Sequence, residues 1–370
     1  MSARSYVLTW LGIFAAIIVL LVVLRGMLLP FVIGMGVAYF LDPVADKMER
    51  RGISRTLSTT ILTAAFLIVV LVAIAFLLPV LQQQLVDFLT NLPGYFQTIR
   101  DWLQPVIERW MSKLDPADVE RIQNAVGAFS GKAVDYTLKL VGDIWAGGAA
   151  LVGFLGVLFI TPVVTFYLLR DWDKLITRIN DWLPKRHAET IREQARAMDQ
   201  TLAGFVRGQG LVCLSLAVFY GAGLSIAGLD FGLVVGIAAG IVSFVPYVGS
   251  VGGLIVSVGL AFLQFDELWR VIVIAAIFLV GQVLEGMVLT PKLVGDRVRL
   301  HPVWVIFAVL AGGSLFGFVG MLVSLPVAAM IGVLVRFGIS QYLSSPLYHG
   351  PDDEKKEAEG GDAGNGPTAV

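Results

Sequence analysis

The chain has 370 residues, of which 57% are hydrophobic and only 15% are charged, and its mean hydropathy is +0.81. Soluble globular proteins carry about 25% charged residues, so this composition excludes an ordinary soluble domain and predicts an integral membrane protein. The formal net charge of −1 excludes a strongly basic nucleic-acid-binding protein, and the single cysteine, Cys213, excludes an intramolecular disulfide.

Apolar runs recur along most of the chain. The first, 6–24, is about 19 residues long, close to the length of about 20 residues that crosses a bilayer as a helix. Because Arg25 and a second apolar run follow it, with no small-residue cleavage site, it predicts an uncleaved helix and not a signal peptide. The later runs are 27–41, 57–80, 147–169, 211–229, 231–265, 271–289 and 303–337.

Two of these runs, 231–265 and 303–337, are too long for one spanning helix, and each is interrupted near its middle. The interruptions are "FVPYVGSVGG" (244–253) and "GGSLFGFVG" (312–320). Proline removes a backbone donor and glycine permits a tight reversal, so each run predicts a helical hairpin. The arms of the first are about 15 and 12 residues, short of a full crossing. We expect broken or re-entrant pairs, with two thin complete spans as the alternative.

Basic residues gather in three connecting segments, 42–56, 170–207 and 291–300. Basic loops near helix ends face the cytoplasm. This rule places both termini inside, with the first hairpin opening outward and the second inward. Irregular backbone at membrane depth is tolerated only where protein or a watery cavity covers it. The two breaks therefore predict a buried site, as in transporters built from inverted repeats.

The segment 81–146 differs from the apolar runs. Its apolar residues recur every three or four positions, with interruptions at Pro93 and at Asp115-Pro116, so it predicts extracytoplasmic amphipathic helices. After residue 350 apolar residues are almost absent, which predicts disorder. The predicted organisation is N-terminal transmembrane helices (1–80), the amphipathic segment (81–146), a transmembrane helix (147–170), a cytoplasmic helical segment (171–202), a transmembrane core with both hairpins (203–340) and a cytoplasmic tail (341–370).

The predicted fold class is an all-α polytopic integral membrane protein. It comprises about five full transmembrane helices and two broken or re-entrant hairpins, which make roughly eight membrane segments, together with the extracytoplasmic amphipathic segment.

Glu285 is the most informative polar residue, because it lies inside the apolar run 271–289. Gln282 precedes it by three residues on the same helix face, and Lys292 follows two turns along the same stripe. An ionised side chain at the centre of a membrane helix costs about 2.5 to 3.5 kcal/mol on insertion scales, so Glu285 predicts proton or ion coupling, or contact with a cargo. The alternative is that Glu285 and Gln282 hydrogen-bond neighbouring helices and only fix packing.

Three further polar residues have two interpretations each. His301 could titrate near physiological pH, or its loop could simply cap a helix. Arg207 and Gln209 begin a membrane helix, where snorkelling at the interface competes with substrate binding. The motifs HExxH, GxSxG and CxxC are absent from the sequence. We therefore predict neither an enzyme nor a metal or cofactor site.

Four segments together resemble the autoinducer-2 exporter (AI-2E) family of permeases. They are "PFVIGMGVAYFLDPVADKMERRGISR" (30–55), "TPVVTFYLLRDWDKL" (161–175), the stretch 205–249 that begins "FVRGQGLVCLS", and the stretch 281–329 that begins "GQVLEGMVLTPK". The resemblance marks as family positions Pro246, Tyr247, Gly249, Gln282, Glu285, Pro291, Lys292, Gly295, His301, Pro302, Gly312, Gly313 and Pro326.

The resemblance implies a multi-pass transporter of the bacterial inner membrane that assembles as a homo-oligomer and exports a small molecule such as autoinducer-2. Sodium-proton exchange is the first alternative. The partners expected are the lipid bilayer and a small-molecule or ion cargo, with no nucleic acid. A non-transporting membrane scaffold that binds partners through 81–146 is the second alternative. An interrupted helix pair and a buried acid favour transport, because a scaffold needs neither.

Overall fold

A computed structural model describes residues 19–111, 148–295 and 300–345, together with Tyr348 and a few single positions before residue 19. Most of the predicted first helix, the second half of the amphipathic segment and the tail lie outside the described residues. The chain divides into two compact units. The first unit comprises Met1–Asp173 and Arg207–Gly295, and the second comprises Lys174–Val206 and Asp296–Val370.

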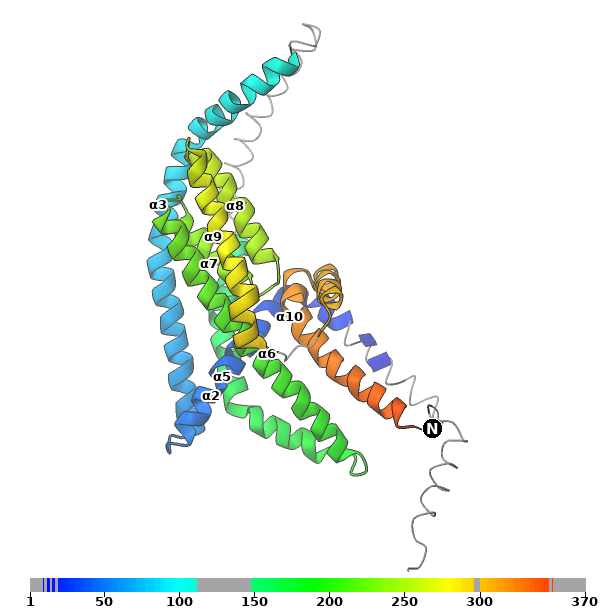
Figure 1. The fold of residues 1–370 in the computed structure, drawn as a ribbon. Coiled ribbons are helices and arrows are strands. Elements are labelled where there is room, and N and C mark those ends of the chain that lie inside the picture. The colour runs from blue at the N-terminus through cyan, green and yellow to red at the C-terminus, as the bar shows by residue number, and fades with distance from the viewer. Residues whose placement is uncertain are drawn as a thin grey trace, which may run out of the picture. The chain divides into compact units, whose positions relative to one another are not determined.

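The described residues form helices and no strand (Figure 1). Six helices are long and apolar enough to cross a membrane, and α7 and α8 are shorter apolar helices. The all-α polytopic fold predicted from the sequence is therefore confirmed. The elements are η1 (Arg25–Met27), α2 (Leu28–Glu49), α3 (Arg55–Met111), α5 (Gly148–Asp181), α6 (Ala188–Ile226), α7 (Gly232–Val242), α8 (Val248–Gln264), α9 (Leu268–Leu284), η2 (Glu285–Val294) and α10 (Pro302–Leu343).

Helix α3 is longer than any bilayer crossing requires. It has 57 residues, about 86 Å at 1.5 Å per residue, and its apolar part covers only Arg55–Gln84. The predicted interruption at Pro93 is wrong, because the helix runs through this residue to Met111. A proline removes one hydrogen bond and can bend a helix without ending it. The break predicted at Asp115-Pro116 lies outside the described residues.

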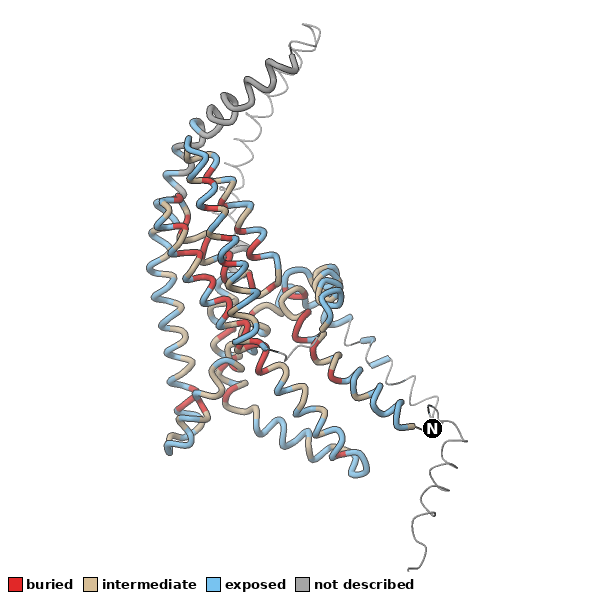
Figure 2. Tube along the Cα trace, in the orientation of Figure 1, coloured by how far each residue is buried: buried red, intermediate tan, exposed pale blue. Residues whose placement is uncertain are grey.

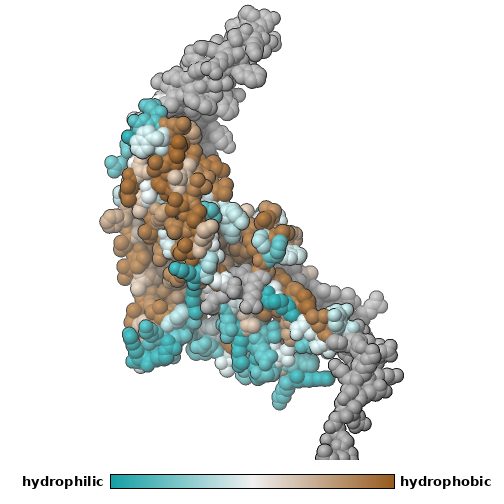
Figure 3. Space-filling view, viewed as in Figure 1, coloured by the Kyte–Doolittle hydropathy of each residue, from teal (hydrophilic) through white to brown (hydrophobic). Residues whose placement is uncertain are grey.

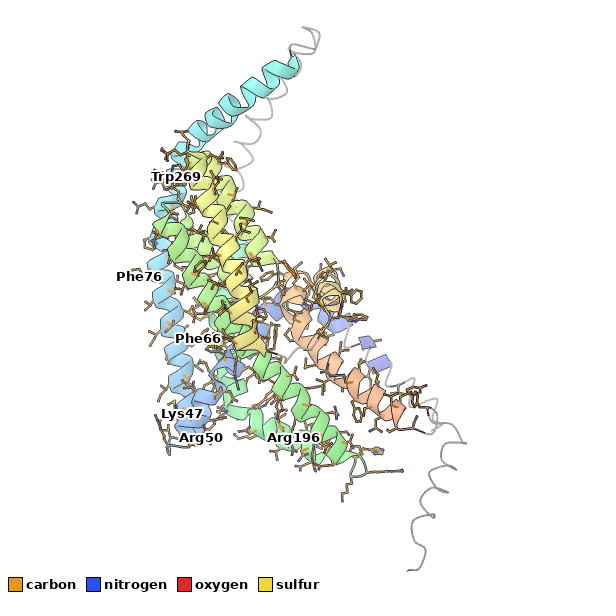
Figure 4. The ribbon with its side chains drawn as sticks, in the orientation of Figure 1. Lys47, Arg50, Phe66, Phe76, Arg196 and Trp269 are labelled. Carbon is orange, nitrogen blue, oxygen red and sulfur yellow. The ribbon has the colours of Figure 1, made fainter. Side chains whose placement is uncertain are left out.

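The first unit has an apolar middle between two polar ends (Figure 3). Lys47 and Arg50 lie at one end, beside the turn from α2 to α3, and Trp269 lies at the other, where α9 begins (Figure 4). Between them Phe76 of α3 points outward, with 78% of its surface exposed. Side chains of this kind expose a large apolar area, which lipid tails would cover in a membrane.

The buried residues of the first unit gather where α6 to α9 face one another, whereas α3 is mostly exposed (Figure 2). Two glycines of α7 set the spacing to α6. A Cβ on Gly236 would lie 2.4 Å from the backbone nitrogen of Gly221, and one on Gly240 would lie 2.2 Å from that of Ala217. Only glycine fits at these positions, so the two helices pack backbone against backbone.

The first predicted hairpin is confirmed as α7 and α8, which are joined by residues 243–247. Tyr247 takes the left-handed conformation, with φ of 67°. The arms have 11 and 17 residues, not about 15 and 12, because Gly249 lies inside the first turn of α8 and not in the reversal. A Cβ on Gly249 would lie 2.3 Å from the nitrogen of Ser243, so this glycine lets α8 pack on the end of α7.

Hydrogen bonds from Gln264 close the open end of this hairpin. Its amide donates to the carbonyl of Gly228 at 2.9 Å and accepts from the backbone nitrogen of Asp230 at 2.8 Å. Burial raises the pKa of the Asp230 carboxyl, and Asp87 of α3 raises it further. The open end of the hairpin is therefore fixed and lies within electrostatic range of α3.

The second predicted hairpin is confirmed in the second unit, where α10 is interrupted at Gly317. This residue has φ of 62° and ψ of −141°, a conformation that residues with a side chain almost never adopt. Across the reversal the backbones touch, since a Cβ on Gly312 would lie 2.4 Å from the carbonyl oxygen of Gly320. Glycine therefore determines the break in two ways: Gly317 adopts the turn conformation, and Gly312 and Gly320 allow the two arms to touch.

A cluster around Arg55 holds α2, α3 and α5 together at the end of the first unit that carries Lys47 and Arg50. The guanidinium is largely buried, with 14% of the side chain exposed. It donates to the carbonyl of Leu169 at 2.9 Å, to Asp42 at 2.8 Å and also to Asp46. The basic pattern of 42–56 predicted only a cytoplasmic location for Arg55 and gave no sign of these contacts.

Replacing Gly317 by alanine should destabilise the second unit by about 1 to 3 kcal/mol, because the observed backbone angles would strain any side chain. Thermal unfolding of the purified protein in detergent measures the effect as a lower midpoint. Gly338→Ala is the matched control, since a Cβ there meets nothing within 4 Å. Equal midpoints for the two variants would contradict this account of the break.

Arg55→Gln should lower stability by about 1 to 3 kcal/mol, because it leaves partly buried carboxylates without their cation. Arg51→Gln, which removes an exposed arginine nearby, should have little effect. The measurement is again the unfolding midpoint in detergent, taken for both variants at the same salt concentration. A midpoint unchanged by Arg55→Gln would show that the cluster does not hold the three helices.

Candidate functional site

Glu285 lies where the last membrane helix of the first unit changes its winding. Helix α9 ends at Leu284, and the ten residues from Glu285 to Val294 form the π-helix η2. The Glu285 side chain is half-buried, and it has no ion pair or hydrogen bond with any residue that the structure describes. The carboxyl predicted from the sequence is therefore an unpaired acid within a candidate membrane span, Leu268–Val294.

The π-helix was not predicted, although its sequence carried one signal. Pro291 lies inside it, and in an α-helix the proline ring would clash with the carbonyl four residues earlier, on Met287. Wider winding with i→i+5 bonds relieves this clash, and Gly295, with φ of 60°, ends the segment. Short π segments inside α-helices occur frequently at functional sites.

The wider winding corrects the predicted stripe from Gln282 through Glu285 to Lys292. Seven residues make two turns only in an α-helix, so Lys292 does not follow Glu285 on the same face of η2. Both Gln282 and Lys292 are exposed, whereas Glu285 is half-buried. The three residues therefore do not form one polar surface.

Helix α6 covers the side of α9 from which Glu285 projects. The ring of Tyr220 stacks on Phe278 with centroids 4.6 Å apart and planes at 24°. A Cβ on Gly281 would lie 2.5 Å from the Tyr220 hydroxyl oxygen, and one on Gly208 would lie 2.4 Å from the carbonyl oxygen of Leu293. The two segments thus run antiparallel in close contact on either side of Glu285.

Two side chains of α6 lie within electrostatic range of the Glu285 carboxyl. They are Cys213 and Tyr220, which occur two helical turns apart. Both belong to the buried core of the unit. The immediate surroundings of the carboxyl on α6 are therefore neutral, and no basic residue that the structure describes forms an ion pair with it.

Gln209 and Arg207 of α6 have structural partners in the first unit. The Gln209 amide donates to the carbonyl of Ser243 at 2.9 Å, which fixes the end of α7 at the tip of the hairpin. Arg207 donates from Nε to the carbonyl of Tyr39 at 2.9 Å, and its Nη2 lies 3.7 Å from a carboxylate oxygen of Asp42. Neither link was among the two interpretations of the sequence, which were snorkelling at the interface and substrate binding.

Of the remaining predicted residues in the first unit, Pro246 and Tyr247 form the tip of the hairpin and Gly249 packs beneath it. Tyr247 is 60% exposed. These three described residues shape the break, and none of them forms a hydrogen bond or an ion pair with Glu285.

Three predicted residues belong to the second unit. Gly312 and Gly313 form the contact across the α10 reversal, where Gly313 faces the side chain of Met321. His301 is the N-cap of α10, and its Nδ1 accepts from the nitrogen of Val303 at 3.4 Å. Capping, the simpler of the two interpretations given for His301, therefore accounts for its position.

Comparison with known proteins gives one family for nearly the whole chain. The family described as AI-2E family transporter matches residues 11–339. The chain is 28% identical over 316 residues to the candidate transport protein YrrI of Bacillus subtilis, covering 85% of this chain and 87% of YrrI. It is 26% identical over 317 residues to the candidate permease PerM of Escherichia coli K12, covering 84% and 87%.

The extent of the family match, together with helices of membrane-spanning length, makes this chain a multi-pass membrane transport protein. By that match the chain belongs to the AI-2E transporter family, as the resemblance of its four segments predicted.

Proposed function

We propose that this protein is a secondary transporter that exports a small polar molecule, with the Glu285 carboxyl as the group that couples transport to a proton or cation. Autoinducer-2 is the cargo that the family resemblance implies. The observation that carries the proposal is the unpaired Glu285 carboxyl, held at the junction of α9 and η2 inside an apolar span.

A purely structural role for Glu285 fits these contacts poorly. Buried polar groups that fix packing are almost always hydrogen-bonded to a protein partner or to water. Glu285 has no such protein partner among the described residues, and an ionised carboxyl in a membrane helix costs about 2.5 to 3.5 kcal/mol. An acid under this constraint is well suited to bind a proton, a cation or a polar cargo.

The hairpin of α7 and α8 supports the same proposal. Helix α7 has 11 residues, about 17 Å, whereas the apolar core of a bilayer is about 30 Å thick. A helix that ends inside the membrane needs protein or water to cover its free backbone groups. Gln209 satisfies the carbonyl of Ser243 at this tip. Discontinuous helices of this type form the binding sites of many secondary transporters.

Sodium-proton exchange is the second candidate function, and the neutral surroundings of Glu285 favour it. A carboxylate without a basic partner attracts cations, and the α6 residues in electrostatic range of it are a thiol and a phenol. A non-transporting scaffold would not need this carboxyl. The scaffold is therefore the least supported of the three candidate functions.

We also propose that the protein lies in the bacterial inner membrane as a homo-oligomer, with both termini in the cytoplasm. The basic residues Lys47 and Arg50 at one end of the first unit support this orientation, because cytoplasmic loops are enriched in lysine and arginine. Trp269, at the other end, would then lie at the outer surface.

Glu285→Gln should reduce flux in reconstituted vesicles by at least about tenfold, because glutamine keeps the shape of the side chain but cannot exchange a proton. Glu267→Gln is the matched control, since Glu267 precedes the same helix and pairs with Arg270 at its polar end. Both variants should retain the unfolding midpoint and the oligomer size of the wild type. Wild-type flux in Glu285→Gln would remove the coupling role.

The flux assay should have two arms, because the two candidate functions predict different results. Release of preloaded autoinducer-2 is followed with and without a pH gradient, and sodium-driven proton movement is followed separately with an internal pH-sensitive dye. Glu285-dependent release supports export, and Glu285-dependent proton movement without release supports exchange. If neither result is observed, the proposal that the protein transports autoinducer-2 or exchanges sodium for protons is wrong.

The orientation predicts which end of the first unit an impermeant thiol reagent can reach. In a Cys213→Ala background, a cysteine introduced by Trp269→Cys should react in intact cells, because this position is exposed and is placed outside. A cysteine introduced by Arg50→Cys should react only after the cells are permeabilised. The reverse pattern would invert the proposed topology.

A further inference from the structure

The hydroxyl of Tyr220 is buried and has no hydrogen-bond partner among the described residues. The side chain is fully buried in the C-terminal part of α6. A buried tyrosine hydroxyl normally finds a partner, because it loses its hydrogen bonds to water on burial. An unsatisfied hydroxyl in the core of the unit therefore indicates a missing acceptor or donor nearby.

The ring of Tyr220 is held in one orientation by α9. It stacks on Phe278, with centroids 4.6 Å apart, and its hydroxyl end lies against the backbone of Gly281, where no side chain could fit. Gly281 and Glu285 are four residues apart, so they lie on one face of the helix in successive turns. The hydroxyl thus lies one turn from the point where the Glu285 side chain leaves α9.

The other charged or titratable groups around Glu285 are few. Helices α7 and α8 contain no titratable residue along their whole length. On α6 the groups within electrostatic range are Cys213 and Tyr220. On its own segment the nearest is Lys292, which is exposed and not aligned with Glu285. Of the two α6 groups, Tyr220 is the stronger donor, because a thiol donates only weakly, and the Tyr220 hydroxyl is buried without a partner among the described residues.

We propose that the Tyr220 hydroxyl is a positioning group of the Glu285 site, and that it donates a hydrogen bond, directly or through one water molecule, to the ionised Glu285 carboxylate. This inference builds on the site of the proposed function and names a second residue in it. It accounts for both unpaired groups together: the hydroxyl gains an acceptor, and the carboxylate gains a donor that carries no charge.

A neutral donor has a different consequence from a basic one. A lysine or arginine beside Glu285 would keep the carboxyl ionised and would compete with a cationic ligand. A phenol stabilises the ionised form more weakly and leaves the site open to a proton or cation. Tyr220 therefore adjusts the pH at which the site exchanges its proton without occupying the site with charge.

The test is a pH titration of Glu285 by dicyclohexylcarbodiimide, which modifies carboxyl groups in their protonated form. The full-length protein in detergent is labelled across a pH series, and mass spectrometry measures modification of the peptide that contains Glu285. In Tyr220→Phe the ring and its stacking remain and only the hydroxyl is lost. The pH of half-maximal labelling should rise by about one unit, because the ionised form loses a donor.

Tyr167→Phe is the matched control, since it removes a tyrosine hydroxyl from a side chain that is 54% exposed on α5. It should leave the titration unchanged, and Glu285→Gln should abolish labelling of the peptide. An unchanged midpoint in Tyr220→Phe would overturn the proposal. A wild-type Glu285 that stays unlabelled at every pH would overturn it too, because a proton-exchanging site must reach the neutral form.

Labelling does not depend on flux, so the two proposals can fail separately. If Glu285→Gln retains wild-type flux while Tyr220→Phe shifts the labelling midpoint, the hydrogen bond between Tyr220 and Glu285 is supported. The proposed role of Glu285 in transport is then wrong. If Tyr220→Phe leaves the labelling midpoint unchanged, the proposed hydrogen bond is wrong. This conclusion does not depend on the flux measured for Glu285→Gln.

Discussion

The first unit depends on how closely the backbone of α6 approaches its neighbours. Gly236 and Gly240 let the backbone of α7 reach it, Gly208 lets it reach the backbone of η2, and Gly281 of α9 leaves room for the ring of Tyr220. In a membrane, helices gain little from hiding apolar surface, because lipid tails are as apolar as leucine. Close backbone contact and the dispersion energy that comes with it are therefore what hold these helices together.

This close packing also explains how an acid can lie in the middle of the unit. Because α6 lies directly against α9 and η2, the side chain of Glu285 is half-covered by protein. The π-helix that begins at Glu285 accommodates Pro291 and changes the direction of the residues that follow, so that Lys292 does not neutralise the carboxyl. The π-helical winding thus accommodates the proline ring and also keeps Lys292 away from the Glu285 carboxyl.

The ends of the first unit are organised by polar contacts and not by apolar ones. At one end, Arg55 joins α2, α3 and α5, and Arg207 links α6 to α2 through Tyr39 and Asp42. At the other end, Gln264 closes the hairpin of α7 and α8. Between these ends the hairpin tip is fixed by Gln209. These polar side chains thus secure helix ends and the hairpin tip, and two buried threonines of α5, Thr161 and Thr165, add bonds to the carbonyls of Pro30 and Gly34 on α2.

The sequence by itself determined the membrane class, the helical fold, the family resemblance, the positions of both hairpin breaks and the unusual acid at Glu285. These follow from hydropathy and from the backbone limits of proline and glycine, which are local properties. Tertiary structure alone decided the partners of Arg55, Arg207 and Gln209, the burial of Tyr220 and the exposure of Gln282. Each depends on which helix faces which, and residues far apart in the chain carry no local signal of that contact.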